Sequence, residues 1–496
     1  MELEVNSVAA YDTTQAAHVA RCLPVRLCND PDIYLDEAID ILFPCCNFES
    51  AEAYANRLSR VGSAFENHYT KLRDLIVGAA LRHPSSPPQS LTPEWENFLA
   101  NVSLNSENLD AFLRRTLLDA IDGGFSGILV DHPETTPDLT VAEEKALALR
   151  PYFLPIKAQD ILAFRTLVES EQIGQNTVYG VKITHLRIRE TITEVDPDDE
   201  FKNLVIPAVS VYDLEEGVVR YRQFILREDK FIPESDSFLS IPLIPFVPVY
   251  GAMPSAHMQC KPLLLDIARL NLNHWQTSAD LAHLLSLTAM PIFTISGVQG
   301  TEPVRTDRAL FLEDSAASAA WQGAPVDGAQ ALMDRLEDLK QAMQTLATVT
   351  LAQKSNGVES AQSKLLDSVQ SDSLVSVIVG QLEDSANKAL QIAALFRGWD
   401  PINITLSRDF SDLGMQAEDV TALANVHAAG GISHRTFLET LERGEVFQGI
   451  DGWSVSEELK RCEDEQGEIS KRSAAGLAPT PDPDLLLTPT TEPEVA

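Results

Sequence analysis

Lys261-Pro-Leu-Leu-Leu-Asp-Ile-Ala-Arg-Leu-Asn-Leu-Asn-His-Trp-Gln-Thr-Ser-Ala-Asp280 is the stretch of this sequence that decides the fold. Its apolar residues recur every three or four positions and continue just beyond it: Leu264, Ala268, Leu272, Trp275, Ala279 and Ala282. Polar residues occupy the opposite stripe: Asp266, Arg269, Asn273, Gln276 and Asp280. This spacing predicts an amphipathic helix over 262–288, with one face packed and the other facing water or a partner.

Two further long helices are predicted after this stretch, over 327–352 and 360–397. The second of them would span roughly 57 Å at 1.5 Å per residue, far beyond an average helix of about 11–12 residues. Gly380 lies in the middle of its pattern and would allow a kink. Between the first two helices the spacing predicts three short strands, at 291–295, 309–313 and 318–321.

The N-terminal part is predicted to be helical and then to change to sheet. Helical spacing covers 32–82, including a run at Leu58, Val61, Phe65, Tyr69 and Leu72. Two more helices are predicted near 93–101 and 106–122, and Ser106 is the expected N-cap of the latter.

From residue 151 onward the apolar period changes to two, which predicts strands. Together with a buried strand before this point, the predicted strands are 127–131, 178–190, 203–212 and 218–226. A phase slip between Ile183 and Leu186 predicts a bulge. The acidic segment 194–200 is expected to be a loop, and 213–217 a hairpin turn.

The remaining segments are short. Prolines in 241–254 remove ladder donors, so this segment is expected to be an extended connector and not a central strand. One strand is predicted over 402–406, and two small helices over 417–428 and 434–443. The Pro-rich, Thr-rich and acidic end of the chain is expected to be disordered.

Composition limits the function. The chain has 496 residues, 73 Asp and Glu against 38 Lys and Arg, and a net charge of −35. This length predicts about two to four substructures. The charge argues against a general phosphate-neutralising surface, but not against a protein that surrounds nucleic acid without binding it tightly. The first residues lack the pattern of a signal peptide and no apolar run suits a membrane span, so we expect a soluble protein made in a cytoplasm, with no membrane partner.

A search for reactive motifs finds no anchor for catalysis. The sequence contains no GxxxxGK[ST], GxSxG or HExxH motif, and the glycine-rich segment 122–127 lies between helix and strand, the reverse of a phosphate loop. The six cysteines form no CxxC pair and are expected to be reduced thiols. His274 and His283 are nine residues apart, which is not ligand spacing. We therefore expect no metal, no cofactor and no enzyme activity.

Long helices that each keep one polar face require neighbours, and identical copies supply them most simply. With the Lys261–Asp280 stretch, the Ile- and Pro-rich segment before it, and the segments 120–131, 151–161 and 430–433, the sequence resembles the portal proteins of tailed bacteriophages. In detail it is similar to a portal-like family annotated only as a domain of unknown function. The resemblance covers about residues 50–445.

The resemblance implies an α+β subunit with a mixed helix and sheet wing, long stem helices, a clip with short strands, a kinked spine helix and a helical crown. Laid onto this sequence, the implied regions are wing 1–260, first stem helix 261–289, clip 290–326, second stem helix 327–352, channel loop 353–360, spine helix 361–398, return to the wing 399–415, crown 416–470 and disordered tail 471–496.

Portal proteins form rings of about twelve copies at a capsid vertex of the virion, and double-stranded DNA passes through them. The resemblance therefore implies a homo-oligomer whose partners are DNA, terminase, the major capsid protein and a head–tail adaptor. In the implied channel loop, Lys354, Ser355 and Asn356 are the expected DNA-facing residues. The alternatives are a ring-forming virion adaptor that does not conduct DNA, and an enzyme whose site the sequence does not disclose.

Overall fold

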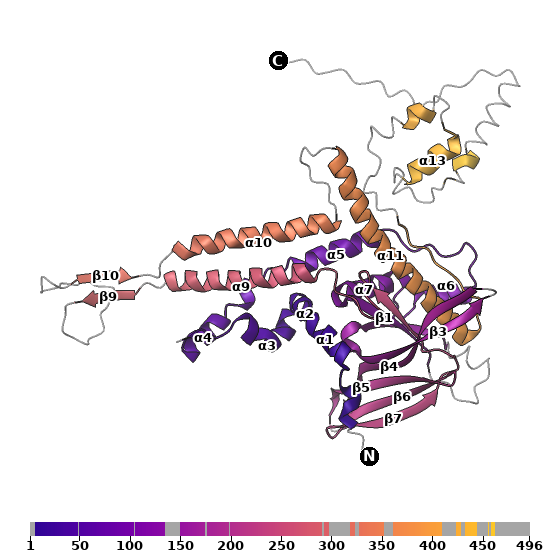
Figure 1. Ribbon diagram of the computed structural model, residues 1–496, viewed down its shortest axis with the longest axis horizontal. Coiled ribbons are helices and arrows are strands. Elements are labelled where there is room, and N and C mark those ends of the chain that lie inside the picture. Colours follow the sequence, from indigo (N-terminus) through magenta and orange to yellow (C-terminus); the bar gives the residue numbers. More distant parts are fainter. Residues whose placement is uncertain are drawn as a thin grey trace. The chain divides into compact units, whose positions relative to one another are not determined.

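A computed structural model gives the structure of this chain (Figure 1). The residues it describes are 5–47, 49–103, 105–133, 149–173, 176–197, 199–289, 292–296, 318–322, 327–351, 361–408, 423–427, 432–443, 455 and 458–461. The chain divides into two units, Met1–Arg408 and Asp409–Ala496. Helices and an antiparallel sheet are segregated along the chain, so the expected α+β class is confirmed.

The first unit begins with helices and 3-10 turns. These are η1 (Val5–Ala9), α1 (Thr13–Arg21), α2 (Leu23–Asn29), α3 (Pro31–Leu42), α4 (Ala51–Leu58), η2 (Gly62–Ala64), α5 (Tyr69–Ala80), α6 (Pro93–Ala100) and α7 (Leu109–Gly123). The expected run through 58–72 is wrong as a single helix, because α4 ends at Leu58 and α5 begins only at Tyr69. Ser106 is not the N-cap of α7 and has a φ of 60°. Asn108 holds that place, since its side chain accepts a hydrogen bond from the Ala111 N–H.

A three-stranded antiparallel sheet follows, in the order β2-β1-β8. Its strands are β1 (Phe125–Asp131), β2 (Tyr152–Lys157) and β8 (Phe246–Tyr250). The expected strand at 127–131 is confirmed, but the expectation of a mere connector over 241–254 is wrong in part. Pro248 lies within β8, and the edge position of this strand tolerates a residue without an N–H. A Cβ on the facing Gly127 would overlap the ring of Phe246, so only glycine fits there.

The second sheet is a five-stranded antiparallel meander. Its strands are β3 (Ile161–Ile173), β4 (Asn176–Asp196), β5 (Asp199–Glu215), β6 (Val218–Arg227) and β7 (Lys230–Phe238), with the short η3 (Ala158–Asp160) before β3. The expected bulge is confirmed, since the β3–β4 register shifts where Ile183 and His185 face adjacent residues of β3. Glu216 and Gly217 both have positive φ in the expected tight turn between β5 and β6. The acidic segment 194–200 is largely strand and not loop, because β4 and β5 continue into it.

One apolar core joins the two sheets. It contains Phe125 and Leu129 of the first sheet and Leu186 and Tyr212 of the second, all nearly inaccessible to solvent. A second buried cluster on the second sheet contains Leu162, Val209, Val211 and Phe231, whereas Phe201 near the start of β5 is 89% exposed. Helix α7 packs against β1 and β2 of the first sheet.

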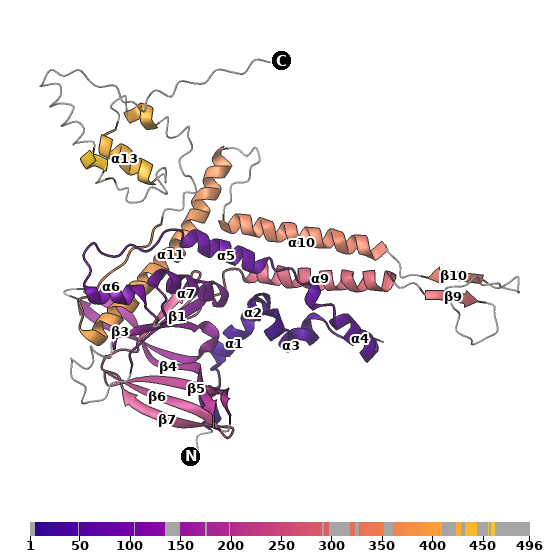
Figure 2. The ribbon, with the colours of Figure 1, turned by 180° about the vertical axis from the view of Figure 1, so that it is seen from behind.

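Long helices complete the first unit. They are α9 (Leu265–Thr288), α10 (Asp327–Leu351) and α11 (Ala361–Arg397), with the strands β9 (Ile292–Ser296) and β10 (Ser318–Gln322) paired between the first two. Helices α9 and α10 lie side by side in Figure 1 and, from behind, in Figure 2. Gly328 at the start of α10 faces Leu284 near the end of α9, so the pair is an antiparallel hairpin.

The predicted stripe of α9 is confirmed, since Leu272 and Trp275 are buried while Asp266 and Arg269 are exposed. Helix α11 buries a similar stripe: Ile378, Leu382, Ala386, Ala389 and Ala393. The expected strand at 402–406 is wrong, because Thr405 makes only an isolated bridge, with Ser86. The Asn387 side chain of α11 instead bonds both the N–H and the carbonyl of Ile404, at 2.7 and 3.0 Å.

The second unit contains α13 (His434–Arg443), which confirms one of the two expected small helices. Of the other, only residues 423–427 are described, and they are helical. The strand expected at 309–313 and the tail 471–496 lie outside the described residues. No helix in the described part of the chain has the length and apolar character that a membrane span requires.

Candidate functional site

The residues expected to face a channel are Lys354, Ser355 and Asn356, and they lie outside the described residues. The segment that carries them connects α10 to α11. The described part of the site is therefore the α9–α10 hairpin before this segment and the groups that hold the hairpin in place.

Asn271 anchors α9 to the start of α5. Its Oδ1 accepts hydrogen bonds from the backbone N–H groups of His68 and Tyr69, at 2.7 and 3.0 Å, and its Nδ2 donates to the Glu66 carbonyl at 3.0 Å. Locally, Asn67 Oδ1 accepts only from the Thr70 N–H, at 3.0 Å, and the N-cap residue His68 makes no side-chain cap. The amide of a residue about 200 positions away in the chain thus satisfies N–H groups that a helix start leaves unpaired.

Trp275 and Gln276 hold the next turn of α9. The Trp275 indole N–H donates to the Val61 carbonyl at 2.7 Å, and its ring packs on Phe43 and Phe65. The Gln276 amide donates to the Leu42 carbonyl, also at 2.7 Å. Because indole and amide donors both end on backbone carbonyls, the first half of α9 is fixed in position as well as buried.

The end of the hairpin has the opposite character. Leu285 and Leu287 in the last turns of α9 are 44% and 51% exposed, and Met333 of α10 is 43% exposed. The outer face of α10 also exposes acidic side chains, at Asp334, Glu337 and Asp338. Helix α9 therefore passes from a buried base to an end that exposes leucines.

Glu66, His68 and His274 form a second group at the base of the hairpin, named here the histidine cluster. One ligand atom from each lies within 4.8 Å of the others. His68 Nε2 is 3.5 Å from Glu66 Oε2, and the two imidazole rings meet edge to face with centroids 5.2 Å apart. Lys340 of α10 reaches the same Glu66 oxygen at 3.1 Å.

Electrostatics prepare this cluster to hold a cation. Burial lowers the pKa of His274 and of His68, which favours neutral imidazoles at neutral pH. The hydrogen bond from Lys340 lowers the pKa of Glu66, which favours its carboxylate. Sequence spacing did not show the cluster because His274 is brought to it only by the packing of α9.

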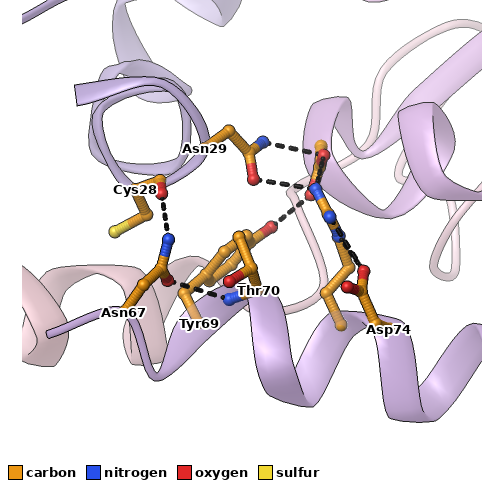
Figure 3. A network of polar contacts seen from close by, with 8 residues as sticks. Cys28, Asn29, Asn67, Tyr69, Thr70 and Asp74 are labelled. Carbon is orange, nitrogen blue, oxygen red and sulfur yellow. Dashed lines mark hydrogen bonds and ion pairs between the residues drawn. The ribbon is translucent and has the colours of Figure 1, made fainter. Parts of the chain in front are cut away.

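A separate set of partly buried polar groups surrounds Asp122 at the end of α7, and its members Asn29 and Tyr69 are labelled in Figure 3. Asp122 Oδ1 accepts from the Tyr69 hydroxyl at 2.6 Å, and Oδ2 accepts from Asn29 Nδ2 at 2.7 Å and Arg73 Nη1 at 2.9 Å. These four residues are named here the Asp122 network. They join α2, α5 and α7 through charge-assisted hydrogen bonds.

A cavity of about 120 Å³ adjoins the network. His18, Cys22 and Asp119 are among its lining residues. Burial raises the pKa of the Cys22 thiol to about 11 and that of Asp119 to about 6, and it lowers the pKa of His18. The thiol is therefore protonated at neutral pH and is a poor nucleophile.

One family model and several solved structures are similar to this chain. The family model "Domain of unknown function (DUF4055)" matches residues 262–397, which include most of the stretch that decides the fold. The match confirms the resemblance to a family of that description. No curated protein matches this chain.

Solved structures of gene transfer agent particles are among those similar to the chain. A chain titled "Virion of native gene transfer agent (GTA) particle" has 11% identity, a TM-score of 0.38, and covers 78% of this chain and 93% of its own length. The neck of an empty GTA particle, computed with C6 symmetry, gives 11%, 0.40, 78% and 92% for the same measures. The neck of a native GTA particle, computed with C12 symmetry, gives 10%, 0.39, 78% and 93%. Neither these titles nor the family description names an enzyme.

Proposed function

We propose that this chain is a portal-type subunit that assembles into a ring of about twelve copies at one vertex of a capsid. The ring would conduct double-stranded DNA during packaging, retention and ejection, and would bind terminase, the major capsid protein and a head–tail adaptor. The observation that carries the proposal is the α9–α10 hairpin, whose base is fixed by hydrogen bonds and whose end exposes apolar side chains.

The order of elements supports this assignment. Helices α9 and α10 correspond to stem helices 261–289 and 327–352, and the β9–β10 ribbon lies in the sequence where the clip, 290–326, belongs. Helix α11 corresponds to the spine, 361–398. In this proposal the two sheets before α9 form the wing, 1–260, and the sequence assigns 399–415 to the return to the wing and 416–470 to the crown.

Charge supports the same function. A conduit must let the duplex slide, and tight phosphate binding would stall it. The net charge of −35 for each copy, with the exposed acids of α10, favours a wall that repels phosphates. Lys354 in the proposed channel loop, 353–360, would add one positive charge for each subunit and make weak, passing contacts with DNA.

Negative-stain electron microscopy of the purified protein tests the assignment. We expect closed rings with a central hole wide enough for a duplex, because the exposed leucines of the hairpin need neighbouring copies. Native mass spectrometry should give the copy number under the same conditions. Monomers or dimers alone, at the ionic strength used for capsid assembly, would contradict the proposal. Rings with a hole too narrow for DNA would favour an adaptor that does not conduct DNA.

Lys354→Glu tests the channel loop in assembled particles. The substitution replaces an attractive charge with a repulsive one, so we expect unchanged rings and less packaged or retained DNA. Lys388→Glu is the matched control, because Lys388 is an exposed lysine of α11 outside the loop. Equal packaging by the wild type and the Lys354 variant would refute the contact with DNA while leaving ring formation unaffected.

A further inference from the structure

We propose that Glu66, His68 and His274 bind a divalent transition-metal ion of the Zn²⁺ class, with water completing the coordination. The inference does not depend on the portal assignment. Two imidazole nitrogens and one carboxylate oxygen are a common three-ligand set for Zn²⁺, whereas Ca²⁺ and Mg²⁺ prefer oxygen ligands only. The three ligand atoms already lie within 4.8 Å of one another.

His274 gives an independent reason to expect a ligand. This residue is only 2% exposed, and neither of its ring nitrogens has a hydrogen-bond partner in the described part of the chain. His68 Nε2 forms no hydrogen bond either, and its near neighbour is Glu66 Oε2, at 3.5 Å. Burying polar atoms without partners costs free energy, so such atoms in a native protein call for an explanation. A bound ion would use a lone pair on each of the two rings.

The backbone around the cluster is held before any ion arrives. Asn271, one turn before His274, bonds the carbonyl of Glu66 and the N–H of His68. Trp275, the next residue after His274, is bonded to Val61. Two ligands on one segment and the third on α9 are thus fixed relative to each other by hydrogen bonds that do not involve the ligand atoms.

Solvent can reach the cluster from one side. The Glu66 side chain is 45% exposed and the His68 side chain 24% exposed, whereas His274 closes the inner side. An ion could therefore enter past the carboxylate and meet His274 last. This arrangement also leaves room for a water ligand on the open side.

Lys340 competes with a metal ion for the carboxylate of Glu66. Its ammonium lies 3.1 Å from Glu66 Oε2, so an ion that takes this carboxylate must weaken or replace the ion pair. Binding of the ion would then loosen a contact between α10 and the segment before α5. Metal occupancy and the position of α10 are consequently coupled through Glu66.

Isothermal titration calorimetry with ZnCl₂ tests the site on untagged, full-length protein after treatment with chelator. Cys45 and Cys46 are adjacent exposed thiols that would also take up Zn²⁺, so the titrations use a Cys45→Ser/Cys46→Ser background. We expect one saturable site for each chain. His68→Gln and Glu66→Gln should each weaken binding by at least about tenfold, as even loss of an outer-shell partner can do. His274→Gln should do the same.

Two further variants complete the test. Lys340→Gln removes the competing ammonium and should tighten Zn²⁺ binding by about two- to fivefold, the range expected for loss of an exposed ion pair. His283→Gln, on the same helix but outside the cluster, should leave binding unchanged. Titration with Co²⁺ should give the visible absorption of a site with nitrogen and oxygen ligands.

Zn²⁺ binding by the His68→Gln and Glu66→Gln variants decides the outcome, because these side chains are partly exposed. The His274→Gln variant counts less, because it alters a buried position. Folding of each variant is checked by circular dichroism. The absence of a saturable site, or binding of equal strength in His68→Gln, Glu66→Gln and the background protein, would overturn the metal site. Binding that does not tighten in Lys340→Gln would overturn the competition with α10.

Discussion

The Asp122 network and the histidine cluster meet at consecutive residues, yet they are opposites in chemistry. Tyr69 belongs to the network and His68 to the cluster. In the network both carboxylate oxygens of Asp122 accept hydrogen bonds, and Arg73 supplies a countercharge. In the cluster the buried ring nitrogens of His274 have no such partners among the described residues.

This difference separates two uses of buried polar groups. A satisfied network fixes helices relative to one another, and removal of a member leaves its partners buried and unpaired. An unsatisfied group gives the folded chain no such stabilisation, so its replacement by an apolar side chain of similar size should cost little. The comparison therefore predicts opposite responses to mutation at two places that lie close together.

The largest effect is expected for Asp122→Ala. The substitution removes the less exposed of the two carboxylates that pair with Arg73, leaving the exposed Asp74, and also removes the acceptor of Tyr69. We expect the free energy of unfolding to fall by about 2–4 kcal/mol, measured by urea denaturation of the unassembled chain. Glu107→Ala is the control, because its partner Arg115 is 46% exposed and the pair should contribute less than about 1 kcal/mol. Equal losses of unfolding free energy in the two variants would show that the Asp122 network stabilises the fold no more than an exposed ion pair does.

Asp119→Asn should have a smaller effect of opposite sign. Burial raises the pKa of Asp119 to about 6, above its ordinary value of 3.8. The folded chain then holds this proton more tightly than the unfolded chain, so the stabilisation is present at low pH and is lost as the pH rises through about 6. We expect the variant to be more stable than the wild type at pH 7 by about 1–3 kcal/mol, and the two to converge near pH 4. Unfolding curves across this pH range that show no convergence would contradict the assignment.

The smallest effect is expected for His274→Met in metal-free buffer. Methionine fills a similar volume and brings no ring nitrogen that needs a partner, so no hydrogen bond is lost. The free energy of unfolding should change by less than about 1 kcal/mol, with an increase as the favoured direction. A loss as large as that of Asp122→Ala would show that His274 is structural, and the contrast between the two groups would then fail.

The sequence predicted correctly whether a segment is helix or strand wherever its apolar pattern continued over many residues. The α9, α10 and α11 stripes and the alternation in β4 to β6 are local properties, since each reflects which side chains one element must bury. The short elements were less predictable. Thr405 forms only a bridge because Asn387 takes the hydrogen bonds of Ile404, and Pro248 joins a strand because its place is at a sheet edge.

What residue order alone determined about this protein is its α+β character, its long amphipathic helices and its acidic charge, because these depend on spacing and composition within each segment. Only the tertiary structure brought Asn271 to the start of α5, Asp122 to Arg73, and His274 to Glu66 and His68. These groups come from segments far apart in the chain. They meet because buried apolar faces bring their helices together, and the spacing of residues along the sequence carries no record of that meeting.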